Sequence, residues 1–258
     1  MAQLPLAEKT VVVIGGTTGL GLAGAAACVA AGARVVVVGR NEEHAGVAVA
    51  QLGKSARAVV GDASDNKTAQ RAVLLAVSEF GRLDALYHVA GGSGRKHGDG
   101  PLDAITDEGW DYTLRLNLTS LFYSNRAAIA QFLAQQSPGV ILNMGSVLGF
   151  SPAPRYFATH AYAAAKAAIE GLSRSAAAYY APHDIRVNVV TPALVETPMS
   201  QRAVGDAAVM RYVRGKQPLD GGRVGQPSDL DAAVVYFLSD QSRFVTGQTL
   251  AVDGGWTV

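Results

Sequence analysis

In the stretch Thr10-Val11-Val12-Val13-Ile14-Gly15-Gly16-Thr17-Thr18-Gly19-Leu20-Gly21, a short β-branched run leads directly into a loop that is rich in glycine. The run favours a buried strand, and residues 20–31 favour a helix. Glycines allow a tight turn and let the backbone approach a pyrophosphate, to which Thr17 and Thr18 can donate hydroxyls. The amino end of the helix adds N–H donors and a positive dipole. The stretch therefore predicts a dinucleotide site, although glycines also serve in plain turns.

The alternation of strand and helix continues along the chain. Further strands are predicted at 34–38, 58–60, 83–89, 139–144, 185–190 and 249–252, and further helices at 41–52, 68–80, 102–110, 111–135, 162–181 and 228–238. Strands that are apolar on both faces and separated by helices are typical of a parallel sheet covered on both sides. We therefore predict an α/β fold, in which residues 1–258 form a single Rossmann-like, doubly wound domain with a parallel sheet of about seven strands.

Length, composition and charge narrow the class of protein. The 258 residues, 49% of them hydrophobic, suffice for one well-buried core. A net charge of +1 argues against a nucleic-acid partner, and a single cysteine, Cys28, argues against a disulfide or a metal site. The first nine residues lack a signal pattern, and no apolar run reaches the roughly 18 residues of a membrane span. We therefore expect a soluble, cytoplasmic protein without a metal or a membrane partner.

The end of the second strand indicates which cofactor the site accepts. A ribose 2′-hydroxyl requires a carboxylate about 20 residues past the glycine loop, whereas a 2′-phosphate requires an arginine. Here Arg40 and Asn41 follow the strand, and no acid stands at its tip. Because a guanidinium binds phosphate through two hydrogen bonds, we predict NADP(H), with NAD(H) as the other possibility. The alternative for Arg40 is a solvated side chain at the start of a helix.

The end of the third strand carries a second candidate for nucleotide binding. Asp62, followed by Ala63, stands directly after this strand. Its carboxylate could accept a hydrogen bond from an adenine amino group, or it could cap the next helix.

The sequence Tyr162-Ala163-Ala164-Ala165-Lys166 opens an alanine-rich run that favours helix as far as residue 181. Residues four apart share one face of a helix, so the phenol and the ammonium lie side by side. Because the ammonium favours phenolate, we predict that the pKa of Tyr162 falls below its ordinary value of about 10. Such a phenol can exchange a proton near neutral pH. The alternative is a plain surface pair on an amphipathic helix.

These features together resemble the short-chain dehydrogenase/reductase family, in its single-domain branch, whose chains have about the length of this one. The resemblance covers nearly the whole chain. It rests on the ordered motifs Gly15-x-x-x-Gly19-x-Gly21, Leu114-Arg115-Leu116-Asn117-Leu118, Ile141-Leu142-Asn143-Met144-Gly145-Ser146, Tyr162-x-x-x-Lys166, Ile185-Arg186-Val187-Asn188 before Pro192 and Thr197, and Thr246-Gly247-Gln248 through Val252-Asp253-Gly254-Gly255. It implies an NADP(H)-dependent oxidoreductase that transfers a hydride between nicotinamide and a ketone or secondary alcohol.

The resemblance also implies the residues of the site. The implied catalytic residues are Asn117, Ser146, Tyr162 and Lys166. Tyr162 would exchange the proton, Ser146 would hold the substrate oxygen, and Lys166 would lower the tyrosine pKa and bind the nicotinamide ribose. Asn117 would hold a water beside Lys166, or bond to the backbone at a helix bend. The implied cofactor-binding residues are Gly15, Thr17, Thr18, Gly19, Leu20, Gly21, Arg40, Asn41, Asp62, Ala63, Val89, Ala90, Gly91, Tyr162, Lys166, Pro192, Ala193, Val195 and Thr197.

The chain departs from the family pattern after the fourth strand, where the family usually has Asn-Asn-Ala-Gly and this chain has His88-Val89-Ala90-Gly91. We interpret His88 as a structural replacement for one asparagine, with a catalytic role as the alternative. Ala193 stands where glycine is common, which requires a φ below zero there.

The segment between Ser146 and Tyr162 is a few residues longer than is usual in the family, and we expect residues 151–160 to border the substrate. Within it, His160 either caps the helix or contacts substrate. Residues 198–225, here named the covering segment, are expected to close over the substrate. The residues that line these segments do not identify the substrate or the physiological direction of the reaction.

Two further classes of function stay open. A catalytically silent dinucleotide-binding sensor or scaffold could keep the same fold, and the His88-Val89 departure leaves room for it. An enoyl reductase would usually space its tyrosine and lysine more widely than Tyr162 and Lys166. Small residues along the two helices that carry Asn117 and Tyr162 permit close packing between subunits, and the family implies a homotetramer or a homodimer.

Overall fold

The computed structural model describes residues 4–258, so Met1 to Gln3 of the predicted domain and of the predicted amino-terminal segment lie outside the described residues. Its parallel strands form one seven-stranded sheet in the order β3-β2-β1-β4-β5-β6-β7. The strands are β1 (Thr10–Ile14), β2 (Arg34–Gly39), β3 (Ala56–Val60), β4 (Ala85–His88), β5 (Gly139–Met144), β6 (Ile185–Pro192) and β7 (Thr249–Val252). The predicted fold class, a Rossmann-like doubly wound parallel sheet, is confirmed.

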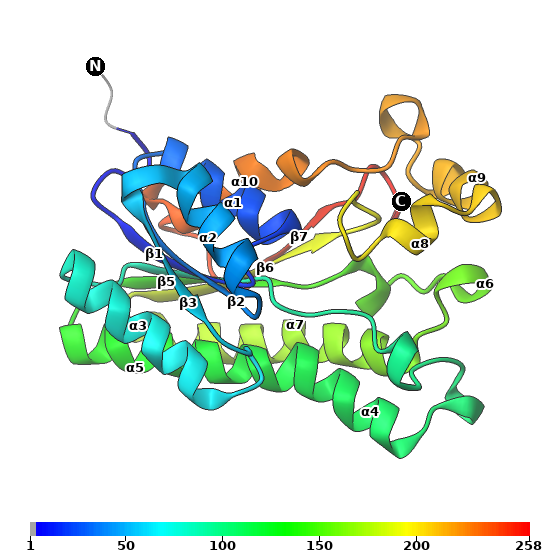
Figure 1. Cartoon of the computed structure of the whole chain (residues 1–258), viewed down its shortest axis with the longest axis horizontal. Helices are drawn as coiled ribbons and strands as arrows, with labels where there is room; N and C mark the ends of the chain where they lie inside the picture. The colour runs from blue at the N-terminus through cyan, green and yellow to red at the C-terminus, as the bar shows by residue number, and fades with distance from the viewer. Residues whose placement is uncertain (1–3) are drawn as a thin grey trace.

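Helices cover both faces of this sheet. Figure 1 shows α1, α2 and α10 on one face and α3, α5 and α7 on the other. The helices are α1 (Gly19–Ala30), α2 (Glu42–Leu52), α3 (Asn66–Phe80), α4 (Asp107–Leu114), α5 (Ser120–Gln135), α6 (Pro154–Phe157), α7 (His160–Tyr180), α8 (Gln201–Val204), α9 (Ala207–Lys216) and α10 (Asp231–Leu238). Because successive strand residues point to opposite faces, Val11 and Val13 enter one core cluster and Val12 and Ile14 enter the other.

The predicted helix over 111–135 is interrupted, and this part of the prediction is wrong. The residues Arg115–Thr119 form a π turn between α4 and α5. Inside it, the side-chain amide of Asn117 donates to the carbonyl of Thr113 at 2.9 Å, which competes with the backbone ladder of the helix. The wider turn directs Asn117 toward the loop after β4 and away from solvent.

Two other predicted bounds are also wrong, for local reasons. The helix predicted at 102–110 is a short 3-10 turn, Leu102–Ala104, followed by α4, because the Thr106 hydroxyl accepts from Gly109 N and starts a new helix. The strand predicted at 83–89 is limited to Ala85–His88, because Leu83 N donates to the side chain of Gln135 instead of to a neighbouring strand.

Three loop segments gather at the carboxyl ends of the strands. Residues 91–101 follow β4, residues 151–160 precede α7, and the covering segment follows β6. Figure 1 shows α6, α8 and α9 together at this end of the sheet, beside the carboxyl terminus. The side chain of Trp256 is 2% exposed and lies between them, 5.8 Å from the Phe157 ring and 6.0 Å from the Tyr212 ring. These contacts join the last residues of the chain to the covering segment.

Candidate active site

The glycine loop between β1 and α1 forms a cradle that larger residues cannot occupy. Gly15 and Gly19 have φ angles of +84° and +53°, in the region that favours glycine. A Cβ at Gly21 would lie 1.9 Å from the carbonyl oxygen of Gly15, and one at Gly15 would lie 2.6 Å from Ala90 N. The amino end of α1 has no side-chain cap from Thr18 and no acidic residue in its first turn. The loop therefore fits the pyrophosphate of a dinucleotide.

The end of β2 places the predicted cofactor-selecting residues at the surface. Arg40 is exposed, and no ion pair within residues 4–258 engages its guanidinium. Asn41 is the N-cap of α2, and its side chain accepts from His44 N at 2.8 Å. Asn41 therefore stabilises the start of α2. The Arg40 guanidinium, which makes no ion pair within residues 4–258, suits a phosphate ligand.

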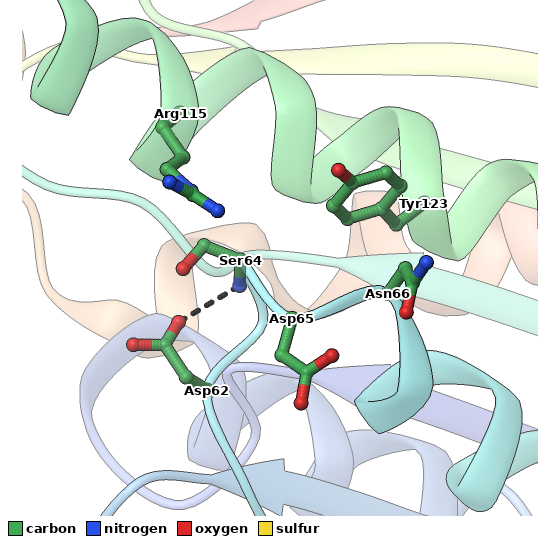
Figure 2. Close-up of a pocket in the computed structure, with 6 residues that line it drawn as sticks. All are labelled: Asp62, Ser64, Asp65, Asn66, Arg115 and Tyr123. Carbon is green, nitrogen blue, oxygen red and sulfur yellow. Dashed lines mark hydrogen bonds between the residues drawn. The ribbon is translucent and has the colours of Figure 1, made fainter.

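Asp62 and Ala63 lie in the turn between β3 and α3. The Asp62 carboxylate accepts from Ser64 N at 2.8 Å, so it closes this turn, and Asp65 is the residue that caps α3. Ala63 packs against the core. Figure 2 shows Arg115, from the π turn, and Tyr123, from α5, across the hollow from Asp62. This hollow has a volume of about 340 Å³ and is lined by Asp62, Ser64, Asp65, Asn66, Arg115 and Tyr123.

Ser146, Tyr162 and Lys166 come together beyond the end of β5. Ser146 follows this strand and is buried, and its hydroxyl lies close enough to the Tyr162 phenol to lower the pKa of that phenol. Lys166 stands one turn further along α7, with Nζ 5.5 Å from the centre of the Tyr162 ring. The Lys166 ammonium donates to the carbonyl of Met144 at 2.9 Å, which ties α7 to the end of β5. The spacing read in the sequence thus produces the expected cluster.

The prediction of a lowered tyrosine pKa is wrong for the protein by itself. Burial raises the pKa of Tyr162 to about 12, and the hydrogen bond from Ser146 opposes this shift without reversing it. Burial also lowers the pKa of Lys166 to about 8, because the ammonium loses its hydration. Desolvation of both groups therefore exceeds the attraction between phenolate and ammonium that the four-residue spacing indicated.

The oxygen and the nitrogen of the Asn117 side-chain amide both hydrogen-bond to the loop after β4. Its oxygen accepts from Gly92 N and its nitrogen donates to Gly92 O, each at 3.0 Å. A Cβ at Gly91 would lie 2.6 Å from the Asn117 oxygen and 3.6 Å from Nζ of Lys166. Only the backbone of Gly91 lies between Asn117 and Lys166. Because glycine has no side chain, the two predicted residues can lie near each other.

His88 takes a structural position inside the sheet. The ring is 1% exposed, with Nδ1 2.7 Å from the Ser124 hydroxyl and Nε2 3.0 Å from the carbonyl of Ala90. Burial lowers its pKa to about 3, and the nearby Lys166 charge adds to this shift. His88 is therefore neutral near pH 7 and fixes Ala90, whose N–H and that of Val89 both donate to the carbonyl of Ile14.

The turn after β6 keeps a free backbone unit where a carboxamide was predicted to bind. Pro192 ends the strand. Ala193, which stands where glycine is common, does not have a positive φ, so alanine fits there. Within residues 4–258, no hydrogen bond uses the N–H or the carbonyl of Val195, because its bridge to Gly225 is made by the residues on either side. Thr197 lies next to the glycine loop, 3.6 Å from where a Cβ of Gly19 would stand.

The residues that border the substrate side divide into an apolar cluster and one half-buried arginine. Val147 and Ala153 pack with Val209, Val213 and Trp256 of the covering segment and the carboxyl end. Arg95 donates to the carbonyl of Tyr156 at 3.0 Å, which links residues 91–101 to residues 151–160. The sequence analysis did not anticipate this link.

The amino end of α7 contains a functional candidate that the sequence analysis missed. His160 is exposed and does not cap the helix with its side chain, and the Thr159 hydroxyl at the N-cap donates to the carbonyl of Phe157 instead of capping the helix. The carboxylate of Asp99, 5% exposed, accepts instead from Ala161 N at 3.0 Å and from Tyr162 N at 3.1 Å. Asp99 stands in a loop that the sequence alone presents as solvated, so no local signal pointed to it.

Comparison with known proteins identifies the family. The family model described as "Enoyl-(Acyl carrier protein) reductase" matches residues 15–257. The solved structure of a short-chain type dehydrogenase/reductase from Mycobacterium ulcerans superposes with a TM-score of 0.90 and 31% identity, covering 98% of this chain and 91% of that one. The chain therefore belongs to the short-chain dehydrogenase/reductase family, whose members are oxidoreductases that use NAD(P) cofactors.

Two curated relatives narrow the comparison further. A 2,5-dichloro-2,5-cyclohexadiene-1,4-diol dehydrogenase of Sphingobium indicum is 35% identical over 253 residues, which are 98% of each chain. The 3beta-hydroxysteroid dehydrogenase 1 of Eggerthella lenta is 37% identical over 257 residues, 98% of this chain and 95% of that one. Both names describe enzymes that act on an alcohol. In the part of the chain that the structure describes, no helix is both long and apolar enough to cross a membrane.

Proposed function

We propose that this protein is an NADP(H)-dependent oxidoreductase that interconverts a secondary alcohol and a ketone, with Tyr162 as the acid and base. The observation that carries the proposal is the placement of the Ser146 hydroxyl next to the Tyr162 phenol, beside the buried Lys166. Two hydroxyls so placed can share one substrate oxygen, which is the arrangement that proton transfer to a carbonyl requires.

The raised pKa of Tyr162 favours one direction of this chemistry. With a pKa of about 12, the phenol is protonated near pH 7 and can donate to a developing alkoxide. Ser146 donates to the same oxygen and stabilises its charge. The nicotinamide, when bound, supplies or accepts the hydride. Lys166 holds the backbone at Met144 and places its positive charge beside the phenol, which assists the phenolate that alcohol oxidation needs.

The cofactor preference rests on the end of β2. Arg40 is exposed and unengaged within residues 4–258, and a guanidinium binds a 2′-phosphate through two hydrogen bonds. The glycine cradle and the uncapped amino end of α1 would hold the pyrophosphate. The free backbone of Val195 and the Thr197 hydroxyl would hold the carboxamide. These residues support NADP(H) over NAD(H).

The substrate class that we propose is a secondary alcohol or ketone on an apolar ring. The names of the two curated relatives describe a cyclohexadienediol and a hydroxysteroid, both of which carry the hydroxyl on a ring. In this chain residues 151–160 and the covering segment carry partly buried apolar side chains, among them Tyr156, Val204 and Met210, packed against a buried core cluster. An apolar wall of this kind suits a ring better than a strongly charged substrate.

Two other functions receive less support from the site. A silent sensor would not need Ser146, Tyr162 and Lys166 placed next to one another, and specific hydrogen bonds hold Asn117, Tyr162 and Lys166 in position. An enoyl reductase matches the description of the family model, but the four-residue step from Tyr162 to Lys166 and the alcohol-directed names of the relatives favour ketone and alcohol chemistry.

The test measures NADPH consumption with cyclic and open-chain ketones, and with an enoyl thioester as the alternative substrate. We expect turnover of ring ketones by the wild type. The variant Tyr162→Phe is expected to lose turnover by about a thousandfold or more, with NADPH affinity retained within about twofold. Retained turnover would show that another group moves the proton, and cofactor binding without any turnover in the wild type would favour the sensor.

A further inference from the structure

We infer that Asp99 is a positioning residue for Tyr162, which holds the first turn of α7 in the geometry that the proposed reaction requires. This inference rests on the proposed function, because it assigns Asp99 a task only if Tyr162 exchanges a proton. Both carboxylate oxygens are engaged, one with Ala161 N at 3.0 Å and the other with Tyr162 N at 3.1 Å. The second bond is made to the backbone of the proton-exchanging residue itself.

The amino end of α7 depends on residues 91–101 for its hydrogen bonds. A helix begins with four N–H groups that have no partner within it. In α7 the N–H of Thr159, at the N-cap, donates to the carbonyl of Phe157 at 2.8 Å, and that of His160 donates to the carbonyl of Gly100 at 3.2 Å. Asp99 accepts from the two N–H groups that remain, those of Ala161 and Tyr162. Residues 99 and 100 therefore satisfy three of the four groups, and Thr159 contributes no side-chain cap.

Asp99 is itself held firmly in place. Its side chain is 5% exposed, and its N–H donates to the carbonyl of Gly94 at 3.1 Å. A Cβ at Gly94 would lie 3.0 Å from the Cβ of Asp99, so the turn closes tightly on itself. The charge of Arg95 attracts the carboxylate from the same turn. A buried carboxylate with these partners has little freedom to move, and it transmits this restraint to α7.

The other end of the same loop is gripped by Asn117. Its amide makes two hydrogen bonds with Gly92, so one short loop connects Asn117 at its start to Tyr162 at its end. Arg95, between these two points, bonds to the carbonyl of Tyr156 in the segment before α7. The loop therefore joins the π turn that carries Asn117 to residues 156–162, which stand much further along the sequence. Release of Asp99 would free the first turn of α7, in which Tyr162 is the third residue.

The effect on the reaction follows from the position of the phenol. The Ser146 hydroxyl lies next to this phenol, and fraying of the first turn would separate them. Misplacement of a reacting group by about 1 Å can lower a rate by about a hundredfold. The glycine cradle for the pyrophosphate lies between β1 and α1, and Arg40 follows β2, so most of the proposed cofactor contacts stay in place and NADPH affinity is expected to change little. A loss in kcat without a loss in NADPH binding is therefore the expected signature.

The experiment compares Asp99→Ala and Asp99→Asn with Asp65→Ala, a matched loss of a helix cap. Asp65 accepts from Lys67 N at the start of α3, which carries none of the proposed catalytic residues. We expect Asp99→Ala to lower kcat for NADPH-dependent reduction of a ring ketone by at least tenfold, with the Kd for NADPH within twofold. Asp99→Asn keeps one oxygen acceptor and is expected to recover kcat to within about fivefold of the wild type. Asp65→Ala is expected to lower Tm similarly to Asp99→Ala and to leave kcat unchanged.

The outcomes separate positioning from a purely structural role. Equal kcat in Asp99→Ala and Asp65→Ala, or equal loss in Asp99→Ala and Asp99→Asn, would overturn the inference. If Asp99→Ala does not fold, Asp99→Asn decides alone: a threefold or greater loss in kcat with unchanged Kd for NADPH supports the inference, and an unchanged kcat overturns it. The variant Tyr162→Phe is measured alongside. Its retained activity would refute the proposed function, whereas its inactivity with kcat insensitive to Asp99 refutes only the positioning role.

Discussion

The buried lysine of the site makes a measurable prediction about stability and pH. Lys166 is 3% exposed, and burial lowers its pKa from 10.5 to about 8. Between these two values the unfolded chain binds a proton that the folded protein does not bind. The free energy of unfolding therefore rises with pH in this window, and the stabilisation is lost as pH falls toward 8. We expect the variant Lys166→Met, which has no ionisable group at this position, to lack this contribution.

The magnitude follows from the shift in pKa. Each pKa unit corresponds to about 1.4 kcal/mol, and integration over the two titrations between pH 7 and pH 9.5 gives about 2 kcal/mol. The wild type should gain this amount relative to Lys166→Met over the same interval. Tyr162 does not interfere, because its folded pKa of about 12 lies above its ordinary value of 10, and it affects stability only at higher pH.

The assay is urea denaturation of both proteins at pH 7 and pH 9.5, which yields the difference in unfolding free energy at each pH. Any constant offset, including the lost bond from Lys166 to the carbonyl of Met144, cancels in the comparison. The control is Lys54→Met, at an exposed site, whose difference from the wild type should not change with pH. A difference for Lys166→Met that is the same at both pH values would refute the assignment of Lys166 as a desolvated amine.

Three further predictions concern the cofactor, the sheet and the assembly. Arg40→Asp is expected to lower the ratio of kcat/KM for NADPH over NADH by at least tenfold, and steady-state kinetics with both cofactors would show an unchanged ratio if Arg40 is only solvated. His88 has a pKa of about 3, below its ordinary 6.5, so the wild type should lose about 2 kcal/mol more than His88→Asn between pH 7 and pH 5. Denaturation curves that move in parallel would contradict a buried neutral ring. Small residues on α5 and α7 favour subunit contacts, so light scattering should give the mass of a homotetramer or homodimer, and a monomer mass would contradict this.

The central strands could be predicted well because they are buried on both faces, whereas the edge strands β3 and β7 are partly exposed. Such strands appear in the sequence as continuous β-branched runs, and the glycines after them mark their ends. The bounds of β1, β5 and β7 agree with the prediction; β2, β3 and β6 are longer by one or two residues, and β4 is shorter. The cluster of Ser146, Tyr162 and Lys166 could also be expected, because helical spacing fixes two of its members and the strand end supplies the third.

The π turn and the role of Asp99 could not be predicted from the sequence. The turn exists because the side-chain amide of Asn117 donates to the carbonyls of Thr113 and Gly92. Gly92 is 25 residues away in the sequence. Asp99 caps a helix 62 residues further along the chain, where local propensity carries no information. A charged residue in a glycine-rich loop has the same local pattern whether it is solvated or buried.

The direction of the Tyr162 pKa shift also could not be predicted from the sequence, for a different reason. The sequence places an ammonium one turn from Tyr162, which predicts a lower pKa. The depth of burial depends on how residues from distant parts of the chain close around the phenol, and this was not visible in a four-residue spacing. Burial proved to be the larger effect, and it acted on Lys166 as well. The protein by itself therefore holds Tyr162 as an acid.

The packing of Trp256 gives this protein an optical probe of its own. The chain has two tryptophans, and the other one, Trp110, lies exposed on α4. A Trp110→Phe variant would therefore leave one fluorophore, wedged between Phe157 before α7 and Tyr212 of α9. Because indole emission responds to neighbouring rings and to water, opening of the covering segment would change the colour and intensity of this signal. Ligand-driven movements of the enzyme could then be timed by stopped-flow without any attached label.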